Sequence, residues 1–176
     1  METEFEAKVL DVDIDSLRAR LDSLGAEKRG DKEQKRYVYD FKPPREDSWV
    51  RLRTDGETTT LTVKEIHNDE VDGTKELEVE VSDFRKTHLL LRKLGYEAKG
   101  YQENRRESYL LDGLEVEIDS WPRIPPYVEV EGKSSEEVEE TLKRLGFDPS
   151  EATSMNTTGV YGKYGIDLNT IKELKF

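Results

Sequence analysis

Charged side chains of both signs recur at every second position in several short stretches of the chain. The first stretch places Glu4, Glu6 and Lys8 on one face of a predicted strand, because successive side chains of a strand point to opposite faces. Later stretches repeat the alternation with cations or with carboxylates. The cations at such positions are Lys8, Arg51, Arg53, Lys64 and Arg106, and the carboxylates are Glu4, Glu6, Asp119, Glu129 and Glu131.

These two sets of side chains suit two kinds of ligand. Carboxylate oxygens are the ligands that a hard divalent cation prefers. Lysine and arginine suit phosphate oxygens, and arginine can contact two of them at once. If both sets face one cavity, they describe a site for a metal-bound polyphosphate. If they face outward from a half-open sheet, they form an ordinary solvated surface, and the alternation alone is compatible with both arrangements.

Hydrophobic periodicity and turn signals predict the elements that would position these residues. Nearly every predicted strand is apolar on the face opposite its charges, and amphipathic helices are available to cover the apolar faces. The charged faces would then line the interior of a closed barrel. The predicted fold is therefore α+β, an eight-stranded antiparallel β-barrel with outer helices. Strands are expected at residues 1–9, 32–41, 49–53, 58–65, 75–81, 98–111, 114–119 and 127–131, and helices at 13–25, 84–94 and 134–145, before a short helix and a tail in 150–175.

The chain also repeats part of its own pattern at a spacing of 70 to 72 residues. The motif Leu-Gly-x-Glu starts at Leu24 and again at Leu94, and Glu4 aligns with Glu76. An ordered repeat of this kind predicts two βαβββ halves within one structure. No linker long enough to separate a second domain is present, so residues 1–176 are expected to form a single domain.

Composition excludes several classes of function. The net charge of −12 argues against a nucleic-acid duplex or an anionic membrane as partner, because either would need a basic surface. The chain has no cysteine and only two histidines, so disulfides, thiolate metal sites and a histidine-rich zinc site are not expected. No signal peptide or apolar run of spanning length is found, which predicts a cytoplasmic protein.

The first of these stretches resembles the signature of a known family. Glu4-Phe5-Glu6-Ala7-Lys8 is similar to the ExExK motif of the CYTH, or triphosphate tunnel metalloenzyme, superfamily. That superfamily includes class IV adenylyl cyclases and several triphosphatases. The spacing from Arg106 to Asp119 and on to Glu129 resembles the class IV cyclase branch. Ordered matches cover residues 4–131 and include Arg51-Leu52-Arg53, Thr62-Val63-Lys64, Glu76-x-Glu78, Arg106-Glu107-Ser108-Tyr109, Asp119 and Glu129-Val130-Glu131.

The resemblance implies an eight-stranded tunnel that holds a triphosphate and a divalent metal, Mg²⁺ or Mn²⁺. Lys8, Arg53, Lys64 and Arg106 would then stabilise the charge that develops during phosphoryl transfer. The metal ligands implied are Glu4, Glu6, Asp119, Glu129 and Glu131, and the triphosphate-binding residues are Lys8, Arg36, Arg51, Arg53, Lys64 and Arg106.

One position departs from the family pattern. The family often has a lysine two residues before the arginine that matches Arg106, and this chain has Asn104 there. The missing charge is either absent or supplied by Arg105 or Arg36. Restoring a lysine at position 104 is expected to tighten triphosphate binding. Trp49 and Trp121 are expected to pack on the outer wall or in turns.

Three functions follow as candidates. Metal-dependent hydrolysis of a triphosphate is favoured, with tripolyphosphate, ATP or another nucleoside triphosphate as substrate. A class IV-like adenylyl cyclase that makes cyclic AMP and pyrophosphate is the alternative supported by motif spacing. A non-catalytic module that binds polyphosphate or nucleotide is the third. The oligomeric state is left open, and a dimer is compatible with the sequence.

Overall fold

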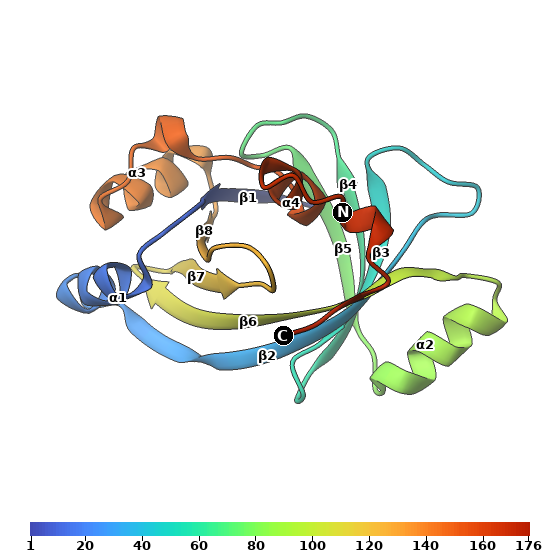
Figure 1. Ribbon diagram of the computed structural model, residues 1–176. Coiled ribbons are helices and arrows are strands. Elements are labelled where there is room, and N and C mark those ends of the chain that lie inside the picture. The colour runs from blue at the N-terminus through green and yellow to red at the C-terminus, as the bar shows by residue number, and fades with distance from the viewer.

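The computed structural model describes residues 1–176 as a barrel with helices on its outside (Figure 1). The helices are α1 (Ile14–Ser23), α2 (Phe84–Lys93), α3 (Ser135–Leu145) and α4 (Thr157–Lys163), with short 3₁₀ turns at Pro149–Glu151 and Leu168–Thr170. The strands are β1 (Glu2–Val9), β2 (Glu27–Tyr39), β3 (Ser48–Thr54), β4 (Thr59–Ile66), β5 (Thr74–Glu80), β6 (Ala98–Leu111), β7 (Leu114–Ser120), β8 (Tyr127–Gly132) and β9 (Glu173–Leu174).

The first eight strands form a closed antiparallel barrel. Their spatial order is β2-β3-β4-β5-β1-β8-β7-β6, and pairing of β2 with β6 closes the ring. This arrangement confirms the predicted eight-stranded barrel. The element order β1-α1-β2-β3-β4 followed by β5-α2-β6-β7-β8 also confirms the two βαβββ halves. The ninth strand was not predicted; it pairs in parallel with β6 at Tyr101 and Gln102.

The largest hydrophobic core lies between one side of the barrel and helices α1 and α3. Fourteen buried residues form it, among them Leu17 and Leu21 of α1 and Val138 and Leu142 of α3. The barrel contributes the apolar side chains that alternate with its charged ones, such as Ala7 and those at the alternate positions Val116, Ile118, Val128 and Val130. Burial of these apolar faces therefore turns the charged faces of the same strands inward.

The local sequence sets where helix α3, which packs on the outside of the barrel, begins and ends. The Ser134 side chain accepts a hydrogen bond from the backbone N–H of Glu137, which caps the first turn. Gly146 ends the helix in a left-handed conformation with φ 95°, which glycine adopts without steric cost. Between these two ends the helix contacts β8 and β1.

Strand β2 is longer than the sequence predicts. It begins at Glu27, not at residue 32, and a β-bulge between Lys28 and Gly30 shifts its register against β6. Gly30 has φ 156° there, a conformation that disfavours other residues, so the extra length depends on this glycine. No helix of the structure is long and apolar enough to cross a membrane.

Candidate functional site

The inward faces of the barrel enclose a cavity of about 720 Å³, within the usual range of small-molecule sites. Its lining comes from all eight barrel strands and from the segment around α4. Every predicted site residue lies on this lining, so the expected convergence of the charged faces in one cavity is confirmed. These residues are Glu4, Glu6, Lys8, Arg36, Arg51, Arg53, Lys64, Arg106, Asp119, Glu129 and Glu131.

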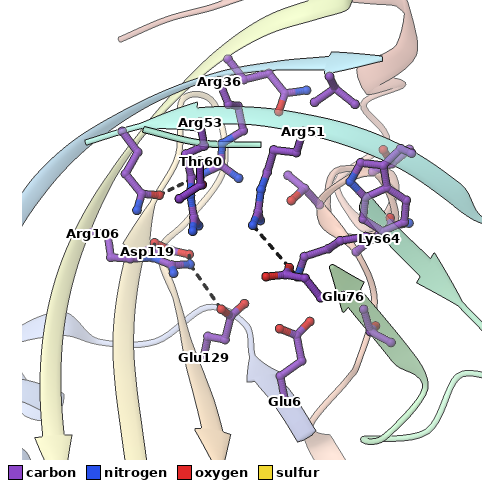
Figure 2. Close-up of a pocket in the computed structure, with 18 of the residues that line it drawn as sticks. Glu6, Arg36, Arg51, Arg53, Thr60, Lys64, Glu76, Arg106, Asp119 and Glu129 are labelled. Carbon is purple, nitrogen blue, oxygen red and sulfur yellow. Dashed lines mark hydrogen bonds and ion pairs between the residues drawn. The ribbon is translucent and has the colours of Figure 1, made fainter. Parts of the chain in front are cut away.

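Three arginines form one wall of the cavity. Arg36 of β2 lies opposite Arg53 of β3 in the strand register, and Arg51 is two residues before Arg53 on the same strand. Figure 2 shows these three side chains facing Glu6 and Glu129 across the cavity. The arginine wall therefore lies across the cavity from these two carboxylates.

The arginine wall carries more positive charge than its own partners neutralise. Repulsion from Arg51, with burial, lowers the pKa of Arg53 to about 10. Burial lowers the pKa of Arg36 well below its usual value, and Arg51 and Arg53 lower it further. Like charges held together destabilise one another. A multiply charged anion bound at this wall would therefore reduce the repulsion among the three arginines.

Two lysines pair with the carboxylates of the cavity. The Lys8 Nζ lies 2.8 Å from Glu6 Oε1 and 2.9 Å from Glu129 Oε2. Burial alone would lower the pKa of Lys8, but Glu129 and Glu6 outweigh it, so the pKa is raised. The Lys64 Nζ lies 2.8 Å from a Glu4 oxygen and 2.9 Å from Glu76 Oε2. Both lysines are therefore held in place by carboxylates.

Arg106 is the centre of a buried ion-pair network. Its Nη2 lies 2.6 Å from Asp119 Oδ2 and 3.3 Å from Glu129 Oε1, and its Nη1 pairs with Glu117. Burial would lower the pKa of Arg106, but Asp119 and Glu117 raise it well above its usual value. The arginine thus remains charged although it is taken out of water.

The carboxylate side of the cavity is short of positive charge. Burial raises the pKa of Glu131 to about 8, and Glu129, Glu4 and Glu6 add to the rise. Burial likewise raises the pKa of Glu4 to about 7 and that of Glu117 to about 7. The Glu131 carboxylate has no ion-pair partner among the salt bridges of the structure. A divalent cation would relieve this crowding, and the all-oxygen set is the kind that Mg²⁺ or Mn²⁺ takes.

The carboxylates do not form a preassembled metal cage. No three histidine, aspartate or glutamate side chains are gathered as a metal-binding group. Glu4, Glu6, Asp119 and Glu129 are instead paired with lysine or arginine. A metal would therefore exchange with these cations, while Glu131 is available without such an exchange.

The structure distinguishes the two arginines proposed to replace the missing lysine. Arg36 lies in the cavity, with its guanidinium 4.6 Å from the ring centre of Trp121. Its Nη2 donates to Gln34 and to the Asn104 side chain, and its buried Nε has no partner. Arg105 points outward and lies over the ring of Phe176. Arg36 is therefore the cation that lies beside position 104.

This geometry adds a stability cost to Asn104→Lys, beside its expected effect on triphosphate binding. Asn104 accepts from Arg36 and donates to Asp119 Oδ1 at 3.2 Å, whereas lysine has no acceptor. We expect the variant to unfold more readily, by about 1–3 kcal/mol, because Arg36 loses a buried partner and gains a like charge. Urea unfolding measures this cost. The double variant Arg36→Gln/Asn104→Lys should regain stability, and a single variant as stable as wild type would contradict the interpretation.

Several lining residues escaped the sequence analysis. Trp49 lines the cavity, so the expected packing on the outer wall or in a turn is wrong for this residue. Trp121 lies in the connection after β7 and packs against Tyr161, which agrees with turn packing, and it also lines the cavity. Glu117 pairs with Arg106, and its place between Glu115 and Asp119 in the alternating pattern was a usable signal. Asn156 and Thr157 also line the cavity, but no motif marks the segment around α4.

The fold and the site together define a class of protein. A closed antiparallel barrel with cations and carboxylates around a central cavity has the architecture of a triphosphate tunnel. The chain belongs to the CYTH family, since the CYTH domain matches residues 1–156. No curated protein matches the chain.

Solved structures agree with this family at the level of the fold. A Pyrococcus horikoshii protein is 24% identical with TM-score 0.74, over 85% of this chain and 93% of that one. A proposed adenylate cyclase from Vibrio parahaemolyticus is 12% identical with TM-score 0.78, over 92% of this chain and 98% of that one. A proposed adenylyl cyclase from Hippeastrum is described with a dominant triphosphatase activity. It is 16% identical with TM-score 0.59, over 96% of this chain and 99% of that one.

Proposed function

We propose that the chain is a metal-dependent enzyme that cleaves phosphorus–oxygen bonds of a triphosphate bound in the barrel, most simply by hydrolysis. The observation that carries the proposal is the arginine wall facing a carboxylate side short of positive charge across one cavity. The phosphate oxygens of the triphosphate would contact the cationic side of the cavity. Tripolyphosphate, ATP and other nucleoside triphosphates share this chemistry.

Phosphoryl transfer depends on positioning and on charge stabilisation more than on covalent chemistry. Lys8, Arg53, Lys64 and Arg106 come from different strands and would hold the phosphate oxygens in one orientation. Arg36 and Arg51 would add binding energy at the same wall. Charge develops on these oxygens as the bond breaks, and cations held in fixed positions stabilise it without rearranging.

A divalent metal fits the opposite side of the cavity. The residues that would hold Mg²⁺ or Mn²⁺ are Glu4, Glu6, Asp119, Glu129 and Glu131, with Glu131 the one that has no cation of its own. The ion would supply further neutralisation of phosphate oxygens and polarise the phosphorus.

Adenylyl cyclisation is the second candidate. It is supported by the spacing of Arg106, Asp119 and Glu129 and by the structural likeness to proteins proposed as adenylate cyclases. The same binding residues would serve, with the ribose hydroxyl as nucleophile and pyrophosphate as leaving group.

Product analysis distinguishes the candidates. The protein is incubated with ATP or tripolyphosphate in the presence of Mg²⁺ or Mn²⁺, and the products are separated by ion chromatography. Phosphate release supports the triphosphatase, and cyclic AMP with pyrophosphate supports the cyclase. Tight binding without turnover would support a non-catalytic polyphosphate- or nucleotide-binding module and contradict the enzyme proposal.

The cation wall predicts strong selection by anion charge. Tripolyphosphate should bind far more tightly than monophosphate, because each added phosphoryl group can gain charge-assisted hydrogen bonds worth about 1.5–3 kcal/mol, or roughly ten- to a hundredfold. Added salt should weaken the binding, since part of the attraction is screened. Calorimetric titration at two ionic strengths measures both effects. Equal affinities for the two anions would mean that the wall does not bind phosphate.

A further inference from the structure

The outer face around β5 and α2 is the least covered part of the barrel. Figure 1 shows α1 and α3 on one side of the barrel and α2 alone on the other. Large apolar side chains that remain more than half exposed gather here, and apart from them only Met1 and Phe176 at the chain ends are so exposed. The exposed residues of this face are Leu77, Val79, Leu89, Leu90 and Leu94.

The internal repeat explains why this face lacks cover. In the second half, α3 follows β8 and packs on β8 and β1. The equivalent strands of the first half are β4 and β5, which are also neighbours in the barrel. There the chain passes from β4 to β5 through residues 67–73 without forming a helix. The β4–β5 pair is therefore missing the helix that its counterpart has.

The uncovered face is shaped to receive an apolar element. A depression of about 270 Å³ lies on it and is lined only by hydrophobic residues, including Leu61, Leu77 and Val79. Leu91 of α2 forms one side of the depression. Leu90 and Leu94, four residues apart and 59% and 66% exposed, give α2 a second apolar face with nothing against it. Patches of this kind on a soluble protein mark interaction sites.

We propose that this face binds a second copy of the chain about a two-fold axis, so that α2 of each copy lies against β4 and β5 of the other. Charge favours this occupant. Helix α2 carries four basic residues and no acidic one, whereas the loop before β5 carries Asp69, Glu70 and Asp72. A two-fold axis at β5 reverses the partner strand and brings its acidic loop toward α2, twice over. An isologous interface of this form closes at two copies.

The oligomeric state of the intact protein tests the proposal. Size-exclusion chromatography with light scattering, over a range of concentrations, should give twice the chain mass of 20.4 kDa. Leu77→Glu and Leu90→Glu place a charge on different elements of the interface, and each should shift the protein to monomer. Phe176→Glu is the matched control, because Phe176 is 55% exposed, as Leu77 is 54%, and its ring lies against Arg105 of β6 and does not line the depression.

The outcomes divide cleanly. Thermal melting and tripolyphosphate binding confirm that each variant is folded, since both leucines point away from the cavity. Monomeric leucine variants beside a dimeric control support the interface. A monomeric wild type would overturn the proposal and leave the face to a different protein. A dimer that survives both leucine variants, or an open-ended assembly, would also overturn it.

Discussion

Arg106→Ala should lower the affinity for tripolyphosphate by roughly ten- to a hundredfold, the value of a lost charge-assisted contact of about 1.5–3 kcal/mol. The same change should destabilise the fold by about 3–5 kcal/mol, because Asp119, Glu117 and Glu129 would be left buried without their shared cation. Calorimetry measures the first effect and urea unfolding the second. The affinity and the stability of Arg106→Lys should lie between those of the wild type and Arg106→Ala, because lysine keeps the charge but lacks the forked guanidinium.

The neighbouring arginine provides a matched control. Arg105 has a 58% exposed side chain, points away from the cavity and pairs with Glu33 at 3.3 Å. Exposed pairs of this kind contribute about 0–1 kcal/mol, so Arg105→Ala should change neither stability nor affinity appreciably. Similar losses in the two alanine variants would show that Arg106 does not act through the cavity.

Glu131→Gln should have opposite effects on the metal-free and the metal-bound protein. In the metal-free protein the pKa of Glu131 is about 8, against an ordinary 4.5, so the folded state holds a proton that the unfolded chain loses. Its carboxylate therefore costs the fold stability progressively as the pH rises from 4.5 toward 8. We expect the variant to melt above wild type, by a margin that grows between pH 5 and pH 8.

In the presence of metal, the wild type should melt above Glu131→Gln. Mg²⁺ or Mn²⁺ should raise the melting temperature of the wild type by binding only the folded state, and the increase should be much smaller in Glu131→Gln. Turnover should disappear on chelation and fall in Glu6→Gln. Glu57→Gln, in an exposed hairpin turn, removes the same charge outside the cavity and serves as control. An unchanged metal response in Glu131→Gln, or full turnover in the presence of a chelator, would count against the carboxylate site.

The barrel was predictable because its main signal is local. Alternation such as Glu4-Phe5-Glu6 assigns each side chain to a face without knowledge of its neighbours. The internal repeat then indicated that both halves have the same βαβββ order of elements. The position of Glu27 at the start of β2 was not predictable in this way, because a glycine bulge interrupts the alternation and pairing with β6 extends the strand.

The contacts inside the cavity depend on long-range geometry. Glu4 pairs with Lys64 and Arg36 stacks on Trp121, although these partners are far apart in the chain. The sequence indicated that Arg36 or Arg105 could replace the family lysine. Alternation already places Arg105 on the face opposite Arg106, but only the pairing of β2 with β6 places Arg36 beside Asn104. The contribution of α4 to the lining had no sequence signal, since small polar residues there serve caps and cavity walls alike.

The position of β1 in the ring has a consequence for biosynthesis. β1 lies between β5 and β8, and Phe5 is paired with Gly132. At about 5–20 residues per second, a ribosome needs on the order of ten seconds to make the intervening chain. During that time the emerging strand has an open edge, which is a template for aggregation unless charges interrupt it. The charges of Glu4, Glu6 and Lys8, which line the finished cavity, are of the kind that disfavours edge-to-edge pairing of such a strand.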